Sequence, residues 1–459
     1  MADAAYTELV DRLRAHQASL DTRDLRWRRS QLQALRAMIV EQEERIFDAV
    51  HSDLRKCRVE SYLTETGFVL GEISHALAHM GQWSRPRGTG TPIYLQPASS
   101  RVIWEPLGVA LIIGPWNYPF HLVMAPLVPC LAAGNAAVLK PSELAPATSA
   151  VISEVVPRYL DGDVVAVVEG GVPQTTALLK QRFDRIFFTG STRVGCIVME
   201  AAAQHLTPVT LELGGKCPCI VDGPARLQVA ARRIANGKFA NAGQTCVAPN
   251  YALVQRDIAD EFLGAMADAI RQFYGPDPQE SPDYARIINQ RHHRRLVELL
   301  EDGEAVVGGE HDEADLYVAP TVLRGVDAGS PVMQEEIFGP ILPVLDVADA
   351  EEALAFVNER PRPLALYLFA EDDEVVARVT HSTRAGGMCV NEAVLHLLVP
   401  ELPFGGVGES GMGTYHGEWG FREFSNARAV LDHGTVFDIG LRYPPYSERD
   451  ERFFRRVRG

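Results

Sequence analysis

The chain has 459 residues, of which 46% are hydrophobic and 23% are charged, and its formal net charge is −16. This length allows two or three domains, and the composition is that of an ordinary globular protein with a large core. The acidic balance argues against a nucleic-acid partner, because binding phosphates needs surplus lysine and arginine.

No run of eighteen or more apolar residues occurs, so we expect no membrane span. The first residues, MADAAYTELVDRLRAHQ, carry charges where a secretory signal would be apolar. The seven cysteines are odd in number and scattered along the chain. That pattern is typical of a reducing compartment and indicates a cytoplasmic protein without a disulfide framework.

Helical periodicity is clearest in residues 24–56, where Leu32, Leu35 and Ile39 recur on one face between polar residues. The stretch SRPRGTGTP, residues 84–92, is rich in proline and glycine and breaks this pattern. We therefore expect the chain to leave the first helical region there and form a separate small element.

From residue 102 onward, short apolar runs alternate with helical stretches. The run GVALIIG is bounded by glycines, as expected of a strand buried in a parallel sheet. The alternation predicts βαβ units. Predicted strands in this half are 108–114, 136–140, 163–170, 185–190 and 208–215, and predicted helices are 120–135, 147–160, 173–181 and 192–205.

The second half of the chain repeats the same texture. Predicted helices are 225–243, 258–273, 351–359 and 374–383, and predicted strands are 251–256, 319–323 and 364–370. The expected fold class is therefore α/β: a Rossmann-like cofactor domain on a parallel sheet, a second α/β domain, and a small bridging or oligomerisation element.

Two polar clusters fall at the ends of predicted strands, where parallel sheets bind ligands. The first is KPSE, from Lys140 to Glu143, and the second is GSTRVG, which runs from Gly190 and Ser191 to Gly195. Backbone N–H groups at the helix that opens in GSTRVG can hold a pyrophosphate. The spacing departs from G-x-G-x-x-G, so a simple strand-to-helix turn is the alternative.

Two further polar residues stand at strand ends. Glu212, in LELGGK, is placed to act as a general base with a pKa raised by burial, or alternatively as a surface or capping carboxylate. Asn117, in GPWNYPF, could donate a hydrogen bond to an oxyanion from its amide. An asparagine bonded to its own turn is the alternative.

Cys246 stands out among the cysteines because of its neighbours in GQTCVAPNY. Gly243 allows a sharp backbone turn before it, and Pro249 restricts how the chain leaves. This context suits a thiol aimed into a cleft. The stretch alone does not separate that interpretation from an ordinary core cysteine.

Later in the chain, EEIFGP contains Glu336, which could hold ribose hydroxyls, and Phe338, which could press on a flat heterocycle. A packed loop is the alternative. The run LPFGGVGESGMG, residues 402–413, contains five glycines, which indicates a mobile loop or a close backbone approach.

We predict no metal site. Cys217 and Cys219 lack a second pair of ligands at zinc spacing. His292 and His293 lie in the basic stretch NQRHHRR and are interpreted as a solvated helix face.

A nucleophilic thiol, a base, an oxyanion donor and a dinucleotide fold together suffice to oxidise an aldehyde through a thioester. The sequence resembles the aldehyde dehydrogenases from about residue 24 to about residue 446. The motifs that carry the resemblance, in the family's order, are PWNYPF, KPSE, FTGST, LELGGK, GQTCVAP, EEIFGP and PFGGVG. NAGQTCVAPNY, the late RYPPY and the short N-terminus resemble the class 3 branch.

The resemblance implies roles for individual residues. Cys246 would attack the aldehyde carbonyl, Asn117 would stabilise the oxyanion, and Glu212 would activate the water that hydrolyses the thioester. The residues expected to meet the cofactor are Lys140, Glu143, Gly190, Ser191, Gly195, Glu336 and Phe338.

A carboxylate at Glu143 favours the free 2′-hydroxyl of NAD, so we expect NAD to be preferred and NADP tolerated. The class implies aromatic or medium- to long-chain aliphatic aldehydes, which agrees with the apolar run in HLLVPEL, residues 396–402. Both that stretch and Cys217 depart from the family pattern.

The resemblance also implies a homodimer and a division of the chain. We expect residues 1–83 and 105–210 to form the NAD(P)-binding domain and residues 211–411 the catalytic domain. Residues 84–104 and 412–459 would form the bridging element and C-terminal tail. Two alternatives to this function are an acylating, coenzyme A-dependent dehydrogenase, which commonly lacks the Glu212 base, and a cysteine hydrolase or acyltransferase, which would need no nucleotide.

Overall fold

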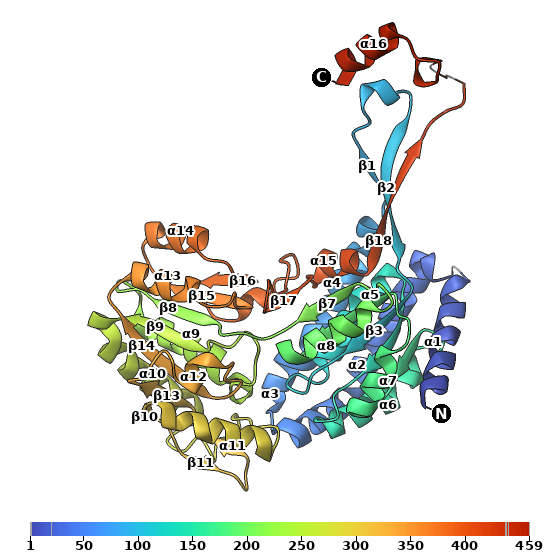
Figure 1. The fold of residues 1–459 in the computed structure, drawn as a ribbon. Helices are drawn as coiled ribbons and strands as arrows, with labels where there is room; N and C mark the ends of the chain where they lie inside the picture. Colours follow the sequence, from blue (N-terminus) through green and yellow to red (C-terminus); the bar gives the residue numbers. More distant parts are fainter. Residues whose placement is uncertain (1, 20, 437, 439, 459) are drawn as a thin grey trace.

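The computed structural model describes residues 2–19, 21–436, 438 and 440–458. Figure 1 shows two helix-covered sheets side by side and a thin arm that projects away from both. The aldehyde-binding and cofactor-binding candidates identified in the sequence lie on the segments that connect or end these two sheets, so the sheets are described first.

The first sheet has the strand order β17-β7-β6-β3-β4-β5 and is parallel except for β17. Its central strands are continuous apolar runs because helices cover both faces. Alternate residues of β3 serve the two faces: Ala110 and Ile112 pack with helices α2, α4 and α5, whereas Val109, Leu111 and Ile113 pack with α1, α7 and α8. The strands are β3 (Val109–Ile113), β4 (Ala136–Lys140), β5 (Val165–Val167), β6 (Arg185–Thr189), β7 (Val209–Glu212) and β17 (Gly411–Met412).

The order of these strands creates a switch point. From β3 the chain steps outward to β4 and β5, and then returns to the other side of β3 to form β6 and β7. Loops that leave the carboxyl ends of β3 and β6 therefore diverge and leave a crevice, which is where open α/β sheets bind ligands. The helices around this sheet are α1 (Ala2–Ala18), α2 (Leu25–Leu54), α3 (Arg58–Ser61), α4 (Gly67–Trp83), α5 (His121–Ala133), α6 (Pro146–Tyr159), α7 (Val172–Leu179), α8 (Thr192–Ala203) and α15 (Gly417–Glu423).

The second sheet has the order β10-β13-β14-β9-β8-β15-β16, and only its edge strand β10 is antiparallel. Its strands are β8 (Pro218–Val221), β9 (Tyr251–Gln255), β10 (Glu304–Val307), β13 (Thr321–Arg324), β14 (Ile341–Val347), β15 (Ala365–Phe369) and β16 (Gly387–Val390). A separate two-stranded ladder joins β11 (His311–Asp312) and β12 (Tyr317–Val318). The helices of this half are α9 (Leu227–Phe239), α10 (Ala259–Tyr274), α11 (Gln290–Leu299), α12 (Pro331–Gln334), α13 (Ala350–Asn358) and α14 (Asp373–Ser382).

The arm is a three-stranded antiparallel sheet of β1 (Arg87–Thr89), β2 (Ser99–Pro106) and β18 (Ser425–Asp432). The last helix, α16 (Glu448–Arg458), lies at its tip (Figure 1). The separate small element expected from the proline- and glycine-rich stretch 84–92 is therefore the start of this arm. The two α/β units expected from the sequence correspond to the two sheets.

One sequence interpretation is wrong. His292 and His293 lie on helix α11, but His293 is buried, and its Nε2 lies 2.9 Å from the carbonyl oxygen of Tyr317. The reason is the helical spacing: His293, Leu296 and Leu299 recur every three residues and form the buried face of an amphipathic helix.

Among the described helices, none combines the length and the apolar character that a membrane crossing needs.

Candidate active site

Cys246 and Glu212 line one cavity of about 610 Å³. The cavity receives residues from both halves of the chain, including Thr189 at the end of β6 and Phe404 from the glycine-rich segment. Glu212 ends a strand of the first sheet, and Cys246 precedes a strand of the second sheet. The two residues are more than thirty positions apart in the sequence, yet they face the same cavity. A thiol and a carboxyl group that share a cavity can act in turn on one bound molecule.

The loop before Cys246 has an unusual backbone. Asn241 and Ala242 both have positive φ angles, of 53° and 49°, and Gly243 follows with φ of +72°. A Cβ atom on Gly243 would lie 2.2 Å from the carbonyl oxygen of Gly339, so only glycine fits. The sequence argument for a sharp turn at Gly243 is therefore supported by a close approach to a second loop.

The side chain of Gln244 holds this loop in place through three hydrogen bonds to backbone groups. Its side-chain amide donates to the carbonyls of Asn241 and Arg286, both at 3.0 Å, and its Oε1 accepts from the backbone N–H of Ile288 at 3.0 Å. Beside it, the hydroxyls of Tyr118 and Thr245 lie 2.6 Å apart. Buried polar groups paired in this way hold the peptide that precedes Cys246 in one position.

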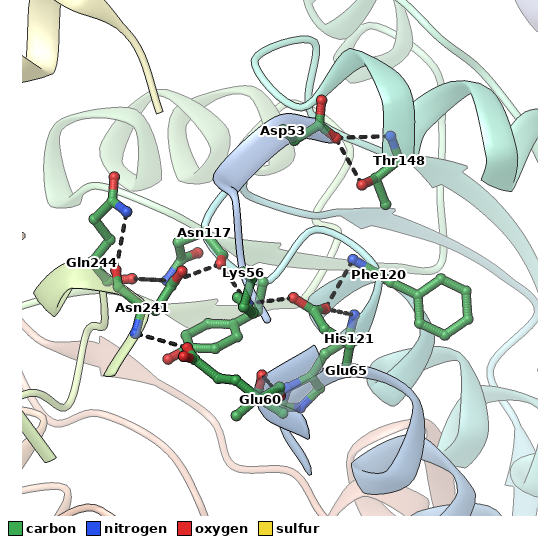
Figure 2. A network of polar contacts seen from close by, with 12 residues as sticks. Asp53, Lys56, Glu60, Glu65, Asn117, Phe120, His121, Thr148, Asn241 and Gln244 are labelled. Carbon is green, nitrogen blue, oxygen red and sulfur yellow. Dashed lines mark hydrogen bonds and ion pairs between the residues drawn. The ribbon is translucent and has the colours of Figure 1, made fainter. Parts of the chain in front are cut away.

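Asn117 follows β3, in the loop that faces the segment before Cys246, and it is 2% exposed. Its Nδ2 donates to the carbonyl of Gln244 at 2.9 Å, and its own carbonyl accepts from Nδ2 of Asn241 at 2.8 Å. Figure 2 shows these three residues bonded to one another. The Asn117 amide thus bonds to the loop that precedes Cys246, residues 240–245, which is called the cysteine loop below. It does not bond to its own turn, and it keeps a second N–H for another acceptor.

A buried ion pair lies beside the loop of Asn117, and no sequence motif indicated it. The Lys56 ammonium lies 2.7 Å from Oε1 of Glu65, and neither side chain is exposed (Figure 2). Oε2 of Glu65 accepts from the backbone N–H groups of Phe120 and His121, at 3.2 and 2.8 Å. The pair therefore fixes the start of α5, directly after Asn117.

Glu60 and Asp53 extend these contacts on either side. Glu60 accepts from the backbone N–H of Asn241 at 2.7 Å. Asp53 accepts from the backbone N–H and hydroxyl of Thr148, at 2.8 and 2.7 Å, and so anchors the first turn of α6 (Figure 2). None of these carboxylates has a local sequence signature, because each bonds to backbone that is distant in the sequence.

Glu212 ends strand β7 and is 3% exposed. Neither of its carboxyl oxygens has a hydrogen-bond partner among the described residues. Burial raises the pKa of Glu212 well above its ordinary value, and the nearby charge of Glu423 raises it further. A carboxyl group whose pKa is moved toward neutrality is suited to exchange protons with water.

Burial also raises the pKa of Cys246 well above its ordinary value, and Glu336, Cys217 and Glu212 add to the effect. This environment favours the protonated thiol over the thiolate. A positive charge placed beside it would favour the thiolate.

His121 and His416 also line the cavity, and sequence analysis missed both. Burial lowers the pKa of each to about 3, so both imidazoles are neutral. His416 stacks on Phe404 with ring centroids 5.1 Å apart. The two imidazoles therefore contribute uncharged rings to the cavity wall, and their polar atoms are the ring nitrogens.

Lys140 and Glu143 follow strand β4 at the carboxyl edge of the first sheet. Lys140 is buried, and its ammonium donates to the carbonyl of Pro141 at 2.6 Å and lies 3.4 Å from Oε2 of Glu143. The side chain of Glu143 is 43% exposed. The carboxylate is thus available to a ligand at the edge where the crevice opens.

Gly190 and Ser191 lie at the adjoining edge, between β6 and α8. A Cβ atom on Gly190 would lie 2.5 Å from the ring of Phe188, and Ser191 is the first residue before α8. Gly195 packs against Leu213, where a Cβ atom would approach to 2.8 Å. Both glycines thus allow close packing of the strand and helix, and the first turn of α8 begins at the carboxyl end of β6, the strand beside the switch point.

Glu336 lines a second cavity of about 470 Å³, with Gly214, Gly215 and Thr192 at the start of α8. Burial raises the pKa of Glu336 to about 7, opposed by the Gly215 backbone and by Lys216. A Cβ atom on Gly214 would lie 1.9 Å from Oε2 of Glu336, so the carboxyl group approaches bare backbone. Phe338 is in edge contact with Trp116, with centroids 5.2 Å apart.

Two lysines near Glu336, the half-buried Lys216 and the fully buried Lys238, were missed at the sequence level. Burial lowers the pKa of Lys216 and of Lys238 to about 7. Lys216 donates to Asn250 and to the Val332 carbonyl, both at 2.6 Å, whereas Nζ of Lys238 has no partner among the described residues. Lys216 directly follows LELGG, and that position was the one available signal.

Comparisons with known proteins identify the family of the chain. The family described as "Aldehyde dehydrogenase family" matches residues 2–430. "Aldehyde dehydrogenase family 3 member A2" of Mus musculus is 49% identical over 441 residues, which are 96% of this chain and 91% of that protein. "Aldehyde dehydrogenase, dimeric NADP-preferring" of Mus musculus is 47% identical over 96% of this chain and 97% of that protein.

Among solved structures, the substrate-bound state of Staphylococcus aureus AldH superposes with a TM-score of 0.96 at 43% identity, and covers 98% of this chain and 99% of that one. The family match covers nearly the whole chain, and the relatives match along most of their own length. The chain belongs to the aldehyde dehydrogenase family, is most similar to its class 3 branch, and is an NAD(P)-dependent oxidoreductase that converts aldehydes to carboxylic acids.

Proposed function

We propose that Cys246 is the nucleophile of this enzyme and that Glu212 activates the hydrolytic water. The Cys246 thiol loses its proton, and its sulfur adds to the aldehyde carbonyl to give a thiohemiacetal. Loss of a hydride from that carbon leaves a thioester. Attack by water releases the carboxylic acid and restores the thiol, so that one aldehyde, one water and one oxidised cofactor are consumed.

The observation that carries this proposal is the shared cavity: Cys246 and Glu212 line one space of about 610 Å³. Glu212 has no hydrogen bond within the described structure that would compete with a water, and its raised pKa suits proton transfer. The second N–H of the Asn117 amide, together with the backbone N–H of Cys246, would stabilise the negative oxygen.

We propose aromatic and medium- to long-chain aliphatic aldehydes as substrates. The walls of the cavity beyond Cys246 are largely apolar, and the side chains that make them so are Leu63, Phe68, Phe273, Leu395, Leu397 and Leu398. An extended hydrocarbon or a ring gains free energy by leaving water there, about 25 cal/mol for each Å² of apolar surface buried.

Bound NAD(P)+ supplies the hydride acceptor, and the residues at the edge of the first sheet fit such a ligand. The bare backbone of Gly214 beside Glu336 and the N-terminus of α8 leave room for ribose and phosphate groups. We propose that Glu336 and Phe338 meet the nicotinamide side, that Lys140 and Glu143 meet the adenosine ribose, and that Gly190, Ser191 and Gly195 line the turn between them.

We propose further that NAD is preferred and NADP tolerated. A carboxylate at Glu143 repels a 2′-phosphate, but Lys140 lies 3.4 Å away and weakens that repulsion. One relative is named NADP-preferring, so the comparison of kcat/KM for the two cofactors is decisive. Equal values would contradict the proposal, and Glu143→Gln should raise kcat/KM for NADP relative to NAD.

The test of the reaction is NADH formation with benzaldehyde and with hexanal through decanal, for the wild type and Cys246→Ala side by side. The wild type should form NADH, and the variant should lose the rate by several orders of magnitude. If NAD binds but no aldehyde is oxidised, the assay with coenzyme A distinguishes an acylating dehydrogenase. A protein that hydrolyses thioesters but binds no NAD would be a cysteine hydrolase instead.

We propose that the enzyme is a homodimer formed through the arm. The strands β1 and β18 are exposed along most of their length, and Leu431 is 53% exposed. A three-stranded sheet with both faces in water is only marginally stable, so a second copy is the expected cover. Sedimentation should give twice the chain mass of 50.4 kDa, and a monomer would contradict the proposal.

The division of the chain into domains at residues 83/84, 104/105, 210/211 and 411/412 stays a prediction. Residues 1, 20, 437, 439 and 459 of the predicted domains lie outside the part of the chain that the structure describes. We also propose a cytoplasmic location, because the described cysteines are all free thiols. Cell fractionation that placed the protein with membranes would contradict it.

A further inference from the structure

A group of three metal-binding side chains lies outside both cavities. His75 and His79 are one turn apart on helix α4, and Glu401 reaches them from the segment after residue 398. Nε2 of His75 lies 3.5 Å from Oε1 of Glu401, and one ligand atom from each of the three residues lies within 4.8 Å of the others. Residues four apart on a helix share a face, so both imidazoles point to the same place.

The two imidazoles are already held in position. Nδ1 of His79 lies 2.9 Å from the carbonyl oxygen of His75, and because a carbonyl only accepts, Nδ1 carries the proton. The lone pair of His79 is therefore on Nε2. The ring of Trp83 packs beside both histidines, with centroids 5.5 Å from His75 and 6.0 Å from His79. Such outer contacts orient the ligands of metal sites.

Two imidazole nitrogens and one carboxylate oxygen are the ligand set of an open zinc site, whereas magnesium and calcium prefer oxygen ligands alone. Zinc bonds of about 2.0–2.2 Å in tetrahedral geometry place neighbouring ligand atoms about 3.3 Å apart. The pair His75–Glu401 is already near that separation. We propose that His75, His79 and Glu401 bind a zinc-like divalent ion, with water in the fourth position.

The position of this site gives the ion a consequence. Glu401 lies three residues after Leu398 and three before Phe404, and both of these line the large cavity. Phe68, seven residues before His75 on the same helix, lines it too. An ion held by both elements ties the segment 395–404 to α4 and so braces one wall of the large cavity.

Cobalt tests the binding, because tetrahedral Co²⁺ absorbs visible light and reports its ligands. All proteins carry Cys246→Ser, so that the reactive thiol does not bind the metal. We expect one equivalent of Co²⁺ to give a visible band without a thiolate charge-transfer band, and Zn²⁺ to displace it. Outer contacts alone change metal affinity by about ten- to a hundredfold, so His75→Gln, His79→Gln and Glu401→Gln should each weaken binding by at least about tenfold.

The matched control is His381→Gln on α14. His381 is exposed, and its Nδ1 lies 2.7 Å from the carbonyl oxygen four residues earlier, an arrangement like that of His79. His381 does not belong to the group of His75, His79 and Glu401. The His381→Gln protein should therefore bind Co²⁺ with the affinity of the parent. Binding that survives His79→Gln, a band that reports thiolate, or no band at all would overturn the proposal.

Hydrogen exchange tests the brace. Saturating Zn²⁺ should slow amide exchange in the segment 395–404 of the parent and leave it unchanged in His79→Gln. Equal exchange in the parent with and without Zn²⁺ would overturn the brace, since an ion that ties two elements together must oppose their separation.

Discussion

Lys56 and Glu65 form an ion pair of 2.7 Å in which neither side chain is exposed to solvent. Lys56 approaches the carbonyl of Asn117, and Glu65 accepts from the backbone at the start of α5. The pair therefore connects the segment between α2 and α4 to the loop that follows β3. Removing one partner of a buried ion pair leaves the other charge without compensation, which costs several kcal/mol, about 3–5.

Glu65→Gln should lower the free energy of unfolding by about 3–5 kcal/mol, because it leaves the Lys56 ammonium buried without its counter-charge. It should also lower kcat/KM, since the loop of Asn117 loses its support. Urea denaturation and steady-state kinetics measure the two effects. The control is Glu44→Gln, which removes an exposed pair with Arg58 and should cost about 0–1 kcal/mol. Equal losses in the two variants would contradict the interpretation.

Gly243→Ala should disable the cysteine loop. A Cβ atom there meets the carbonyl oxygen of Gly339 at 2.2 Å and also requires a φ of +72° from alanine. Gly325→Ala provides the comparison, because Gly325 has a similar φ of +68° but open space around it. Gly325→Ala should cost about 1–2 kcal/mol from the backbone alone and retain activity. Gly243→Ala should cost more and lose most activity; if both variants behave alike in thermal unfolding and kcat, the close approach is unimportant.

Glu212 should set the acid limb of the pH profile. In the proposed reaction its carboxylate form accepts the proton from water, and burial raises its pKa well above the ordinary value of 4.5. Activity should therefore fall as the pH drops through that raised pKa, at a pH where an exposed glutamate is still ionised. Glu212→Gln should remove this limb and lower kcat by about 10²–10⁴-fold.

A rapid-mixing experiment separates the role of Glu212 from a general loss of structure. If Glu212 serves the hydrolysis of the thioester, Glu212→Gln should still form a burst of NADH equal to the amount of enzyme before turnover stops. A variant without any burst would place the role of Glu212 before hydride transfer.

Glu72 should make the protein less stable as the pH rises. It lies on α4, accepts from the backbone N–H of Gly417 at 3.1 Å, and its pKa is raised by burial to about 7 from 4.5. The folded state holds this proton more tightly than the unfolded state does, so stability falls between about pH 4.5 and pH 7 and stays reduced above it.

Glu72→Gln keeps an oxygen acceptor for Gly417 and removes the ionisation. At pH 8 it should raise the free energy of unfolding by about 3 kcal/mol, the value of a shift of this size. Denaturant unfolding at several pH values measures this. Glu200→Gln, at an exposed position of α8, should leave the pH dependence unchanged. A Glu72→Gln protein with the same pH dependence as the wild type would contradict the prediction.

The parallel sheets were predictable because their strands are buried on both faces. The run 108–114 is apolar at every position between its glycines, and the structure has a strand at Val109–Ile113. Residues 24–56 showed one apolar face, and the helix runs from Leu25 to Leu54. In both cases the local pattern reports the burial directly.

Other features depend on contacts that a local pattern does not contain. Helix α1 was not predicted, because only a few of its residues, such as Val10 and Leu13, pack on the first sheet, and charged residues stand between them. Glu65 looks like any surface glutamate until α5 is folded against it. His293 was placed on the wrong face because a basic neighbourhood outweighed its spacing from Leu296.

For the active site, the sequence brought forward Cys246, Glu212 and Asn117, and in the structure the first two line one cavity while the third bonds to the cysteine loop. The glycines near Cys246 and Glu336 were informative because they mark positive φ angles or close approaches. Lys238, His121 and His416 were not found, since a single buried polar residue has no sequence neighbours that reveal its partner.

The pairing of β2 with β18 runs without interruption from Ser99 opposite Asp432 to Pro106 opposite Ser425. More than three hundred residues of chain separate these partners. A nascent polypeptide emerging from the ribosome therefore exposes β2 while both helix-covered sheets are still being synthesised, and the arm closes only when the final strand has been released. Translation that stops before residue 425 leaves a chain that has Cys246 and Glu212 but an unpaired β2 edge, and such an edge is a template for aggregation.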